Sequence, residues 1–458
     1  MSSKSVSRRA LESMGPVRGT KDYLPAEQLV REQIVDILKA TFKLFGYSPI
    51  ETSVLESYEV AASKYGGGSE ILKETYRLSD RGDRDLCLRY ELTFKFAKLV
   101  ANHPEIKLPF KRYEIGKVFR DGPIRAGRLR EFTQCDVDVI GTKSMIADAE
   151  LLAMIGTTFP KLGLDVNTQI NDRKILFGIF EICGIPSDKH PEVALSLDKL
   201  EKAGSAAVSE ELKAKGISEE SIKKIFDIFE RITALQDNNE KLSFLKSLSV
   251  NSENSLLSEG ITELQELLDY YTEFNVKGDV KFTPTLARGL GYYTGPMWEV
   301  YLSTPSNITS SLAAGGRWDK MTGQLLGTEE EYPATGMTFG LDVIYAVLEE
   351  RQSNTTYNPA LHTVPTILLI PTDQQVITAC MRISTELREA GISTDIAIDT
   401  KVGAALSNAN KRNIPFISVI GDRELTSGNA IIRDMQTGSE KKVDVHNMAV
   451  DFSAILRG

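Results

Sequence analysis

Cysteine and histidine are scarce in this sequence, and neither is spaced for metal binding. The 458 residues include four cysteines and four histidines, and no two cysteines form a CxxC pair. Structural zinc sites and disulfide frameworks need such residues at short, regular spacings. We therefore expect no protein-bound metal, a reducing compartment, and buried structural thiols at Cys87, Cys135, Cys183 and Cys380.

Long hydrophobic runs are also missing. No stretch approaches the roughly 18 consecutive apolar residues that a membrane-spanning helix needs. The N-terminal segment MSSKSVSRRALESMG has no apolar run behind its two adjacent arginines, which is unlike a signal peptide or a membrane anchor. With 41% hydrophobic and 26% charged residues, the sequence predicts a globular, cytoplasmic protein that does not bind membranes.

The chain has no excess of positive charge. Its net charge of −9 counts against indiscriminate binding of nucleic acid, because phosphate contacts need lysine and arginine. A local basic patch is nevertheless present between residues 107 and 130, where only two acidic residues occur. Its members are Lys107, Lys111, Arg112, Lys117, Arg120, Arg125, Arg128 and Arg130.

Composition divides the chain into regions. Residues 185–275 show helical periodicity and an acidic balance, which predicts a helical insertion. Residues 351–363 are polar and contain Pro359, as expected of a linker. Beyond them, strands alternate with helices over 364–458, which predicts an α/β domain with a mostly parallel sheet.

Three segments concentrate charged, aromatic and glycine residues. The first is LRYELT at 88–93, which we interpret as a strand. Glu91 and Thr93 would then point to the same face and hold a ligand ammonium group together. The alternative for this segment alone is a polar stripe that faces solvent.

The second segment is a predicted pair of strands, 111–120 and 129–140, joined by a glycine-rich loop. Arg120 ends the first strand and Arg128 begins the second, and arginine suits bidentate contact with phosphate. Gln134, Asp136 and Asp138 alternate along one face of the second strand. The hairpin therefore predicts a site for a triphosphate beside a small polar molecule.

The third segment comprises LARGLGYYTGPMWEV (286–300) and AAGGRWDKM (313–321). Arg288 stands among glycines, which let the backbone approach a ligand closely. Gly315 and Gly316 precede Arg317 in the same way. One glycine-rich turn is a weak signal, but three such segments together predict a nucleotide-dependent reaction on a small molecule.

These motifs resemble those of class II aminoacyl-tRNA synthetases, and specifically the histidyl-tRNA synthetase family. The hairpin is similar to motif 2, an FR followed by a loop and GRxREFxQxDxD. LARGLGYYTG is similar to the histidine signature RGLDYYTG, and AAGGRWDKM to its companion GGRYD. The resemblance runs nearly end to end and includes the C-terminal domain.

The resemblance implies roles at matching positions. Arg120 would hold the ATP α-phosphate and Arg128 the outer phosphates, with Mg²⁺ assisting, and Arg120 and Arg288 would be catalytic. Asp138 and Tyr293 would face the imidazole ring of L-histidine. The full set of implied histidine-binding residues is Glu91, Thr93, Gln134, Asp138, Arg288, Tyr292 and Tyr293.

This sequence departs from the family pattern at four places. Ser53 aligns with a usual proline of motif 1, Gly291 with an aspartate, and Trp318 with a tyrosine. Motif 3 should end in a Glu-Arg pair, and the matching residues are Asp342 and Val343. Valine cannot replace a stacked guanidinium.

The resemblance implies an α+β architecture. A class II catalytic domain on an antiparallel sheet would comprise residues 1–184 and 276–350, with the helical insertion 185–275 between them. A linker, 351–363, would lead to an anticodon-binding domain, 364–458. The implied partners are tRNA(His) and a second copy of the chain in a homodimer. The alternatives are a histidine-sensing regulatory subunit of ATP phosphoribosyltransferase and an RNA-binding scaffold.

Overall fold

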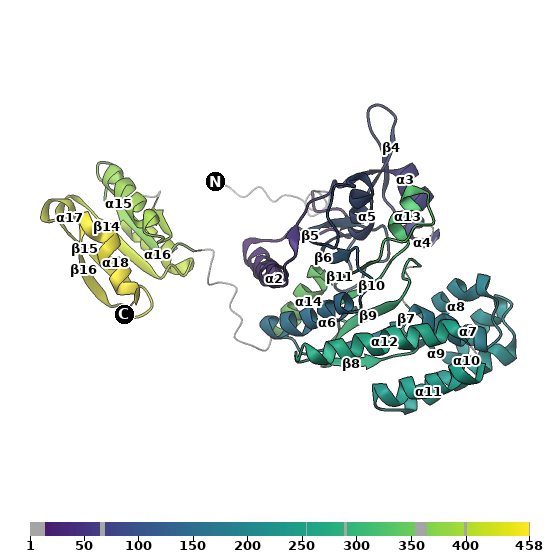
Figure 1. The fold of residues 1–458 in the computed structure, drawn as a ribbon. Coiled ribbons are helices and arrows are strands. Elements are labelled where there is room, and N and C mark those ends of the chain that lie inside the picture. The colour runs from purple at the N-terminus through teal and green to yellow at the C-terminus, as the bar shows by residue number, and fades with distance from the viewer. Residues whose placement is uncertain are drawn as a thin grey trace. The chain divides into compact units, whose positions relative to one another are not determined.

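In the computed structural model, the chain forms two compact units (Figure 1). One comprises Met1–Asp22 and Arg31–Thr355, and the other Tyr23–Val30 and Thr356–Gly458. The residues that the structure describes are 14–64, 69–252, 254–287, 291–352, 364–397 and 401–457.

The larger unit is built on an eight-stranded sheet in the order β1-β5-β6-β11-β10-β9-β7-β8. Its neighbouring strands are antiparallel except for the outer pairs β1·β5 and β7·β8, which are parallel. This confirms the predicted antiparallel sheet. The strands are β1 Ser48–Pro49, β5 Phe110–Phe119, β6 Glu131–Ile140, β7 Val166–Asp172, β8 Asp279–Phe282, β9 Pro296–Leu302, β10 Ala313–Arg317 and β11 Ala334–Gly340.

The hairpin of β5 and β6 is the centre of the motif 2 segment. The two strands pair over ten residues, from Phe110 opposite Ile140 to Phe119 opposite Glu131. The predicted strands are therefore confirmed to within two residues. Arg128, however, lies in the connecting loop rather than at the start of a strand, because regular pairing begins only at Glu131.

Helices surround this sheet. The Arg31–Leu44 part of α2 belongs to this unit, and α14 follows Gly340 directly. Helix α6 is mainly apolar and largely buried, which is typical of a helix packed on both sides. The helices are α2 Pro25–Leu44, α3 Tyr58–Lys64, α4 Ser69–Lys73, α5 Thr93–Asn102, α6 Ile146–Thr158, α7 Arg173–Ile182, α12 Ser255–Glu273, α13 Met321–Leu326 and α14 Leu341–Gln352.

A second, three-stranded sheet of the order β2-β4-β3 precedes α5. Its strands are β2 Leu55–Ser57, β3 Arg77–Ser79 and β4 Asp85–Leu88. The prediction that 88–93 forms a strand is wrong, because β4 ends at Leu88 and α5 begins at Thr93. Glu91 lies in the turn between them, so strand alternation does not orient its side chain.

Besides α12, four α-helices lie within the region predicted as an insertion, 185–275. Its limits as a domain stay a prediction. The sequence of these helices explains their form: Ser218 caps α10 by accepting a hydrogen bond from the Ser221 amide at 3.1 Å. Ile222, Ile225 and Phe229 then recur at helical spacing on its buried side. The helices are α8 His190–Leu197, α9 Leu200–Ala214, α10 Glu219–Ala234 and α11 Asn238–Ser252.

The C-terminal unit has a five-stranded sheet, β13-β12-β14-β15-β16. The prediction of a mostly parallel sheet holds for β13, β12 and β14 and is wrong for β15 and β16, which are antiparallel. The links before β15 and β16 span only 421–428 and 435–439, too short for a parallel crossover. The elements are β12 Ile367–Pro371, α15 Ile377–Glu389, β13 Thr394–Ile396, α16 Val402–Lys411, β14 Phe416–Ile420, α17 Asp422–Ser427, β15 Asn429–Asp434, β16 Glu440–Asp444 and α18 Met448–Arg457.

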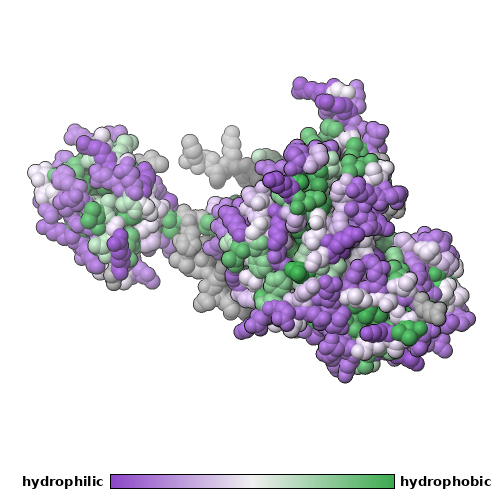
Figure 2. All heavy atoms as spheres, viewed as in Figure 1, coloured by the Kyte–Doolittle hydropathy of each residue, from purple (hydrophilic) through white to green (hydrophobic). Residues whose placement is uncertain are grey.

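The face of the molecule drawn in Figure 2 is mainly hydrophilic. On the face drawn in Figure 2, hydrophobic residues form small, separate groups among hydrophilic ones. Among the described residues, every helix is too short or too polar to cross a membrane. All four cysteines are free and buried, as predicted.

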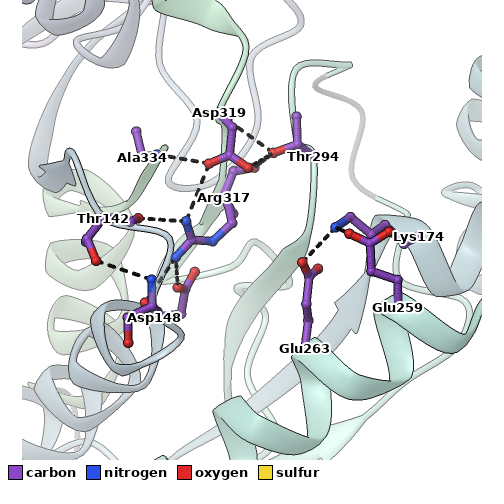
Figure 3. A network of polar contacts seen from close by, with 10 residues as sticks. Thr142, Asp148, Lys174, Glu259, Glu263, Thr294, Arg317, Asp319 and Ala334 are labelled. Carbon is purple, nitrogen blue, oxygen red and sulfur yellow. Dashed lines mark hydrogen bonds and ion pairs between the residues drawn. The ribbon is translucent and has the colours of Figure 1, made fainter. Parts of the chain in front are cut away.

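A buried polar network ties β10 to α6 (Figure 3). The Arg317 guanidinium pairs with Asp148 of α6, donates to the Thr142 carbonyl oxygen at 3.0 Å, and lies 3.4 Å from Asp319. Asp319 in turn accepts hydrogen bonds from Thr294 and from the Ala334 amide. Burial raises the pKa of Asp148, and the charge of Arg317 opposes this rise.

We expect Asp148→Ala to destabilise the larger unit by about 3–5 kcal/mol, because it removes the nearer carboxylate of a buried guanidinium and leaves only Asp319, at 3.4 Å, of the two. Urea denaturation of the purified chain measures this loss. Glu220→Ala is the control, because it removes an exposed ion pair with Lys224 and should leave the transition where it is. Equal transitions for both variants would contradict the prediction.

Candidate active site

A cavity of about 510 Å³ opens on the polar face of β6 and β11. The structure brings eight of the nine predicted site residues to its wall, although they come from three separate segments of the sequence. Arg288 lies outside the described residues. The eight are Glu91, Thr93, Arg120, Arg128, Gln134, Asp138, Tyr292 and Tyr293.

Acidic and amide groups form the floor of the cavity. Gln134, Asp136 and Asp138 follow one another at every second position of β6, so the strand presents all three on the same face. Burial raises the pKa of Asp136 to about 6 and that of Asp138 to about 7, while the charge of Arg112 opposes both rises. The Gln134 side-chain oxygen is buried and has no hydrogen-bond donor among the described residues.

Arg112 supports this floor from β5. Its side chain has no solvent exposure, and its guanidinium lies 2.6 Å from Asp138 and 3.7 Å from Glu114. It also lies 4.6 Å from the centre of the Phe96 ring, which provides a cation–π contact. Arg112 and Asp138 lie directly opposite each other on β5 and β6, so the pairing of these two strands fixes the positions of both charged groups.

Glycines leave the room that the floor needs. A Cβ atom on Gly336 of β11 would lie 1.9 Å from an oxygen of Asp138, its register partner. Gly316 has φ of +155°, and a Cβ atom there would lie 2.7 Å from the Tyr293 ring. These two positions therefore admit only hydrogen as a side chain without moving a site residue.

The paired tyrosines close one side. Tyr292 donates a hydrogen bond from its hydroxyl to Glu91 at 3.2 Å, across 201 positions of sequence. Its ring centre lies 4.8 Å from that of Tyr293. Glu91 is buried and lines the cavity. The turn before α5 therefore places this carboxylate in the predicted site, although the predicted strand is absent.

Arg120 lies against two aromatic rings. Its guanidinium carbon lies 4.2 Å from the centre of the Tyr90 ring and 5.1 Å from that of Phe132. Its Nε donates to the Tyr90 carbonyl oxygen at 3.2 Å. These contacts restrict the side chain where it lines the cavity.

The loop between β5 and β6 brings more arginines to the cavity. Arg125 and Arg128 exchange backbone hydrogen bonds at 3.1 and 2.9 Å, which folds the loop tip into a tight turn. Between them Gly127 has φ of +71°, and a Cβ atom there would lie 3.3 Å from Val343. Both arginines and Val343 line the cavity, so guanidinium groups are present beside the position where motif 3 lacks one.

Sequence reasoning missed Glu74, which anchors this loop. Its carbonyl oxygen accepts from the Asp121 amide at 2.7 Å, and its carboxylate accepts from the Tyr90 hydroxyl at 3.1 Å. The same carboxylate lies 3.8 Å from Arg128. No motif marks Glu74, because its partners are 16 to 54 positions away in the chain.

A further stretch of wall was also not predicted. Gln169, Glu299 and Tyr301 line the cavity from β7 and β9, with Thr285 and Leu286 nearby. In the part of the chain that the structure describes, no three histidine, cysteine, aspartate or glutamate side chains form a group that could hold a metal ion.

Comparison with known proteins identifies the family. The family model described as histidyl-tRNA synthetase matches residues 19–344, and the one described as an anticodon binding domain matches residues 366–452. This chain belongs to the histidyl-tRNA synthetase family. The resemblance seen in the motifs is thereby confirmed.

Individual relatives agree over nearly the whole chain. Histidine–tRNA ligase 1 of Bacillus cereus is 42% identical over 441 residues, which cover 95% of this chain and 99% of that protein. A crystal structure of histidyl-tRNA synthetase from Nostoc sp. PCC 7120 matches with a TM-score of 0.80 and 27% identity, covering 96% of this chain and 99% of that chain. A Bacillus halodurans structure described as an ATP phosphoribosyltransferase regulatory subunit/histidyl-tRNA synthetase shares the fold, with a TM-score of 0.69, 20% identity, and 89% and 98% coverage.

We expect Gly336→Ala to destabilise the larger unit by about 1–3 kcal/mol, because the added methyl group collides with Asp138 and the Val137 carbonyl oxygen. Gly340→Ala is the matched control on the same strand, since its Cβ atom would meet Val343 at an ordinary 3.4 Å. Denaturant titration of both variants checks the difference. If both unfold as the parent does, the floor does not require glycine at 336.

Proposed function

We propose that this chain activates L-histidine with ATP, giving histidyl-adenylate and pyrophosphate, and then transfers the histidyl group to the 3′ end of tRNA(His). The observation that carries the proposal is the cavity itself. Carboxylates, an amide and arginine side chains all line it. An amino acid with several donors and a nucleotide with several phosphate acceptors need these two kinds of group.

Histidine would occupy the floor. Glu91, Thr93 and Gln134 would accept hydrogen bonds from its α-ammonium group, since all three present oxygen atoms to the cavity. Asp138 and Tyr293 would face the imidazole, with Tyr292 completing that side. The buried Gln134 oxygen supports this placement, because a bound donor would satisfy it.

ATP would occupy the wall beneath the hairpin loop. Arg120 would bind the α-phosphate and Arg128 the outer phosphates, and Arg125 would supply part of the charge that Val343 lacks. Mg²⁺ would arrive with the nucleotide and keep phosphate oxygens and waters as ligands, for which a dedicated protein site is not needed. Of the cavity carboxylates, Glu299 lies outside the histidine floor and would be its protein contact.

The activation step needs charge stabilisation more than covalent chemistry. The histidine carboxylate attacks the α-phosphorus, and pyrophosphate leaves. Arg120 would neutralise one side of the phosphoryl group and Arg288 the other. Leu286 and Tyr292, close to Arg288 in sequence, line the cavity, which supports this role.

The second domain would recognise the anticodon, and the chain would act as a homodimer in the cytoplasm. Two exposed apolar residues, Val54 and Leu55, follow Ser53 in the segment that resembles motif 1, which supports a dimer interface there.

The only feature that supports the regulatory-subunit alternative is valine at 343, where the family has the motif 3 arginine. The anticodon-binding match over 366–452 favours the ligase, because the regulatory relatives usually lack this domain.

Histidine-dependent exchange of labelled pyrophosphate into ATP tests the proposed activation step. Arg120→Ala should slow this exchange by about a hundred- to a thousandfold, the usual cost of losing one contact to a developing charge. Lysine at 120 should restore only part of the rate, because it lacks the planar fork. Lys117→Ala, three residues before Arg120 in β5 but paired with Glu131 and not part of the cavity lining, should leave the rate unchanged. A parent protein without exchange would overturn the proposal.

Histidine binding should release about one proton at pH 6.5. Asp138, with its pKa raised to about 7, is then largely protonated, and free imidazole with a pKa near 6.5 is about half protonated. If the neutral imidazole donates its N–H to an ionised Asp138, both groups must lose their protons on binding. Calorimetry in buffers of different ionisation enthalpy measures the release, and affinity should rise from pH 6 to pH 8.

Asp138→Asn is the control for this proton release. Only the imidazole can release a proton in that variant, so the value should fall to about half. Binding of the imidazolium form to an ionised Asp138 would release almost none, which would contradict the prediction.

A further inference from the structure

The edge strand β8 is capped by side chains from the helical insertion. It pairs within the eight-stranded sheet only with β7, so its outer backbone groups need other partners. Asn238, the first residue of α11, donates from its amide to the Val280 carbonyl oxygen at 2.8 Å and accepts from the Phe282 amide at 2.9 Å. This bidentate contact takes the place of a neighbouring strand.

Lys241 adds a second contact one turn further along α11. Its ammonium donates to the Phe282 carbonyl oxygen at 3.0 Å, and the side chain is buried. Burial lowers the pKa of Lys241, so this charge is held against a desolvation cost. Asn238 and Lys241 together bind both backbone groups of Phe282, the last residue of β8.

The residues that follow Phe282 lead to the cavity lining, which includes Thr285 and Leu286. Thr283 still pairs with Ile170 of β7 through its amide, at 2.9 Å. The buried Asn171 side chain then donates to the carbonyl oxygens of Pro284 and Leu286, at 3.1 and 2.8 Å. The segment 282–286 is therefore held by α11 at its start and by β7 along its length.

This segment is part of the cavity wall. Thr285 and Leu286 line the cavity, and so do Leu197 and Asp198 at the end of α8. Two helices of the insertion, α8 and α11, thus contribute to the site, one by direct contact and the other through β8.

We propose that the helical insertion helps to position the activation site. In this proposal Asn238 is a positioning residue for the wall segment 282–286. The proposal rests on the proposed function, since that wall would face the reacting groups. Without the Asn238 amide, two part-buried backbone groups of β8 lose their partners and the segment shifts. Displacement of about 1 Å in a wall that orients reactants costs as much as a hundredfold in rate.

The histidine floor has separate supports. Asp138 is held by Arg112 and Gly336, and Glu91 by the turn before α5. A shift of 282–286 should therefore reduce the turnover number for activation more than histidine affinity. A loss of general stability would not produce this separation.

The test compares Asn238→Ala with Asn239→Ala in the full chain. Asn239 is the next residue of the same helix and is exposed. Asn238→Ala should lower the turnover number of histidine-dependent pyrophosphate exchange by about ten- to a hundredfold, while the calorimetric Kd for histidine stays within about threefold. Hydrogen exchange of the backbone amides in 280–287 should accelerate in Asn238→Ala and not in Asn239→Ala.

A second variant, Lys241→Met, replaces Asn238→Ala in the test if the latter does not fold. Methionine retains most of the buried aliphatic part of the lysine side chain and removes the ammonium group that binds Phe282. It should lower the turnover number in the same direction. Parent-like turnover and amide exchange in Asn238→Ala, or in Lys241→Met where that variant stands in, would overturn the inference. An inactive parent would instead count against the proposed function, and the amide-exchange comparison would still decide whether α11 holds the wall.

Discussion

A fully buried arginine beneath the cavity floor constrains much of the surrounding structure. Arg112 cannot be accommodated in the sheet without counter-ions, because a guanidinium removed from water costs several kcal/mol. Asp138 and Glu114 supply them, and Arg89 lies 3.0 Å from Glu114 as a second cation. The resulting cluster is held by β5, β6 and the chain before α5. Its geometry decides which Asp138 oxygen can face the cavity.

This charge cluster also fixes the strand register. Arg112 is directly opposite Asp138 on β6, and Asp138 is directly opposite Gly336 on β11. A slip of one residue would turn Asp138 into the apolar core and bring Cys135, Val137 and Val139 to the cavity. It would also place a residue with a Cβ atom against Asp138. Register, charge pairing and glycine placement therefore select the same arrangement of strands.

The sequence predicted those features that strand periodicity and motifs encode. The alternation of Gln134, Asp136 and Asp138 required only a strand and a period of two, and both are present. Glu91 reached the cavity although the strand proposed for it does not exist, because a turn can present a carboxylate without any periodic signal. Glu74, Arg112 and Asn238 could not be predicted, since each acts through partners that only the folded sheet brings near.

The same limit explains the C-terminal sheet. Alternating strands and helices indicate a parallel sheet, and β12, β13 and β14 follow that rule. The rule fails for β15 because α17 spans only six residues and is followed by Gly428 with φ of +69°. A connection of that length returns the chain antiparallel. The short link between β14 and β15 therefore decides that β15 runs antiparallel to β14. The sequence of this link was not interpreted as a tight connection.

The cavity is polarised, and this polarity has a chemical consequence. The chain is acidic overall, yet three arginines line the cavity, Arg125 and Arg128 from the loop between β5 and β6 and Arg120 from the start of that loop, while Asp136 and Asp138 line it from within β6. A ligand with cationic and anionic ends can satisfy both surfaces in only one orientation, because the reverse orientation sets like charges together. For an amino acid, that orientation directs the ammonium to the floor and the carboxylate toward the arginines. The field of the site would therefore orient the carboxylate toward a bound phosphate before any bond forms, which is where most of the rate gain in such a transfer originates.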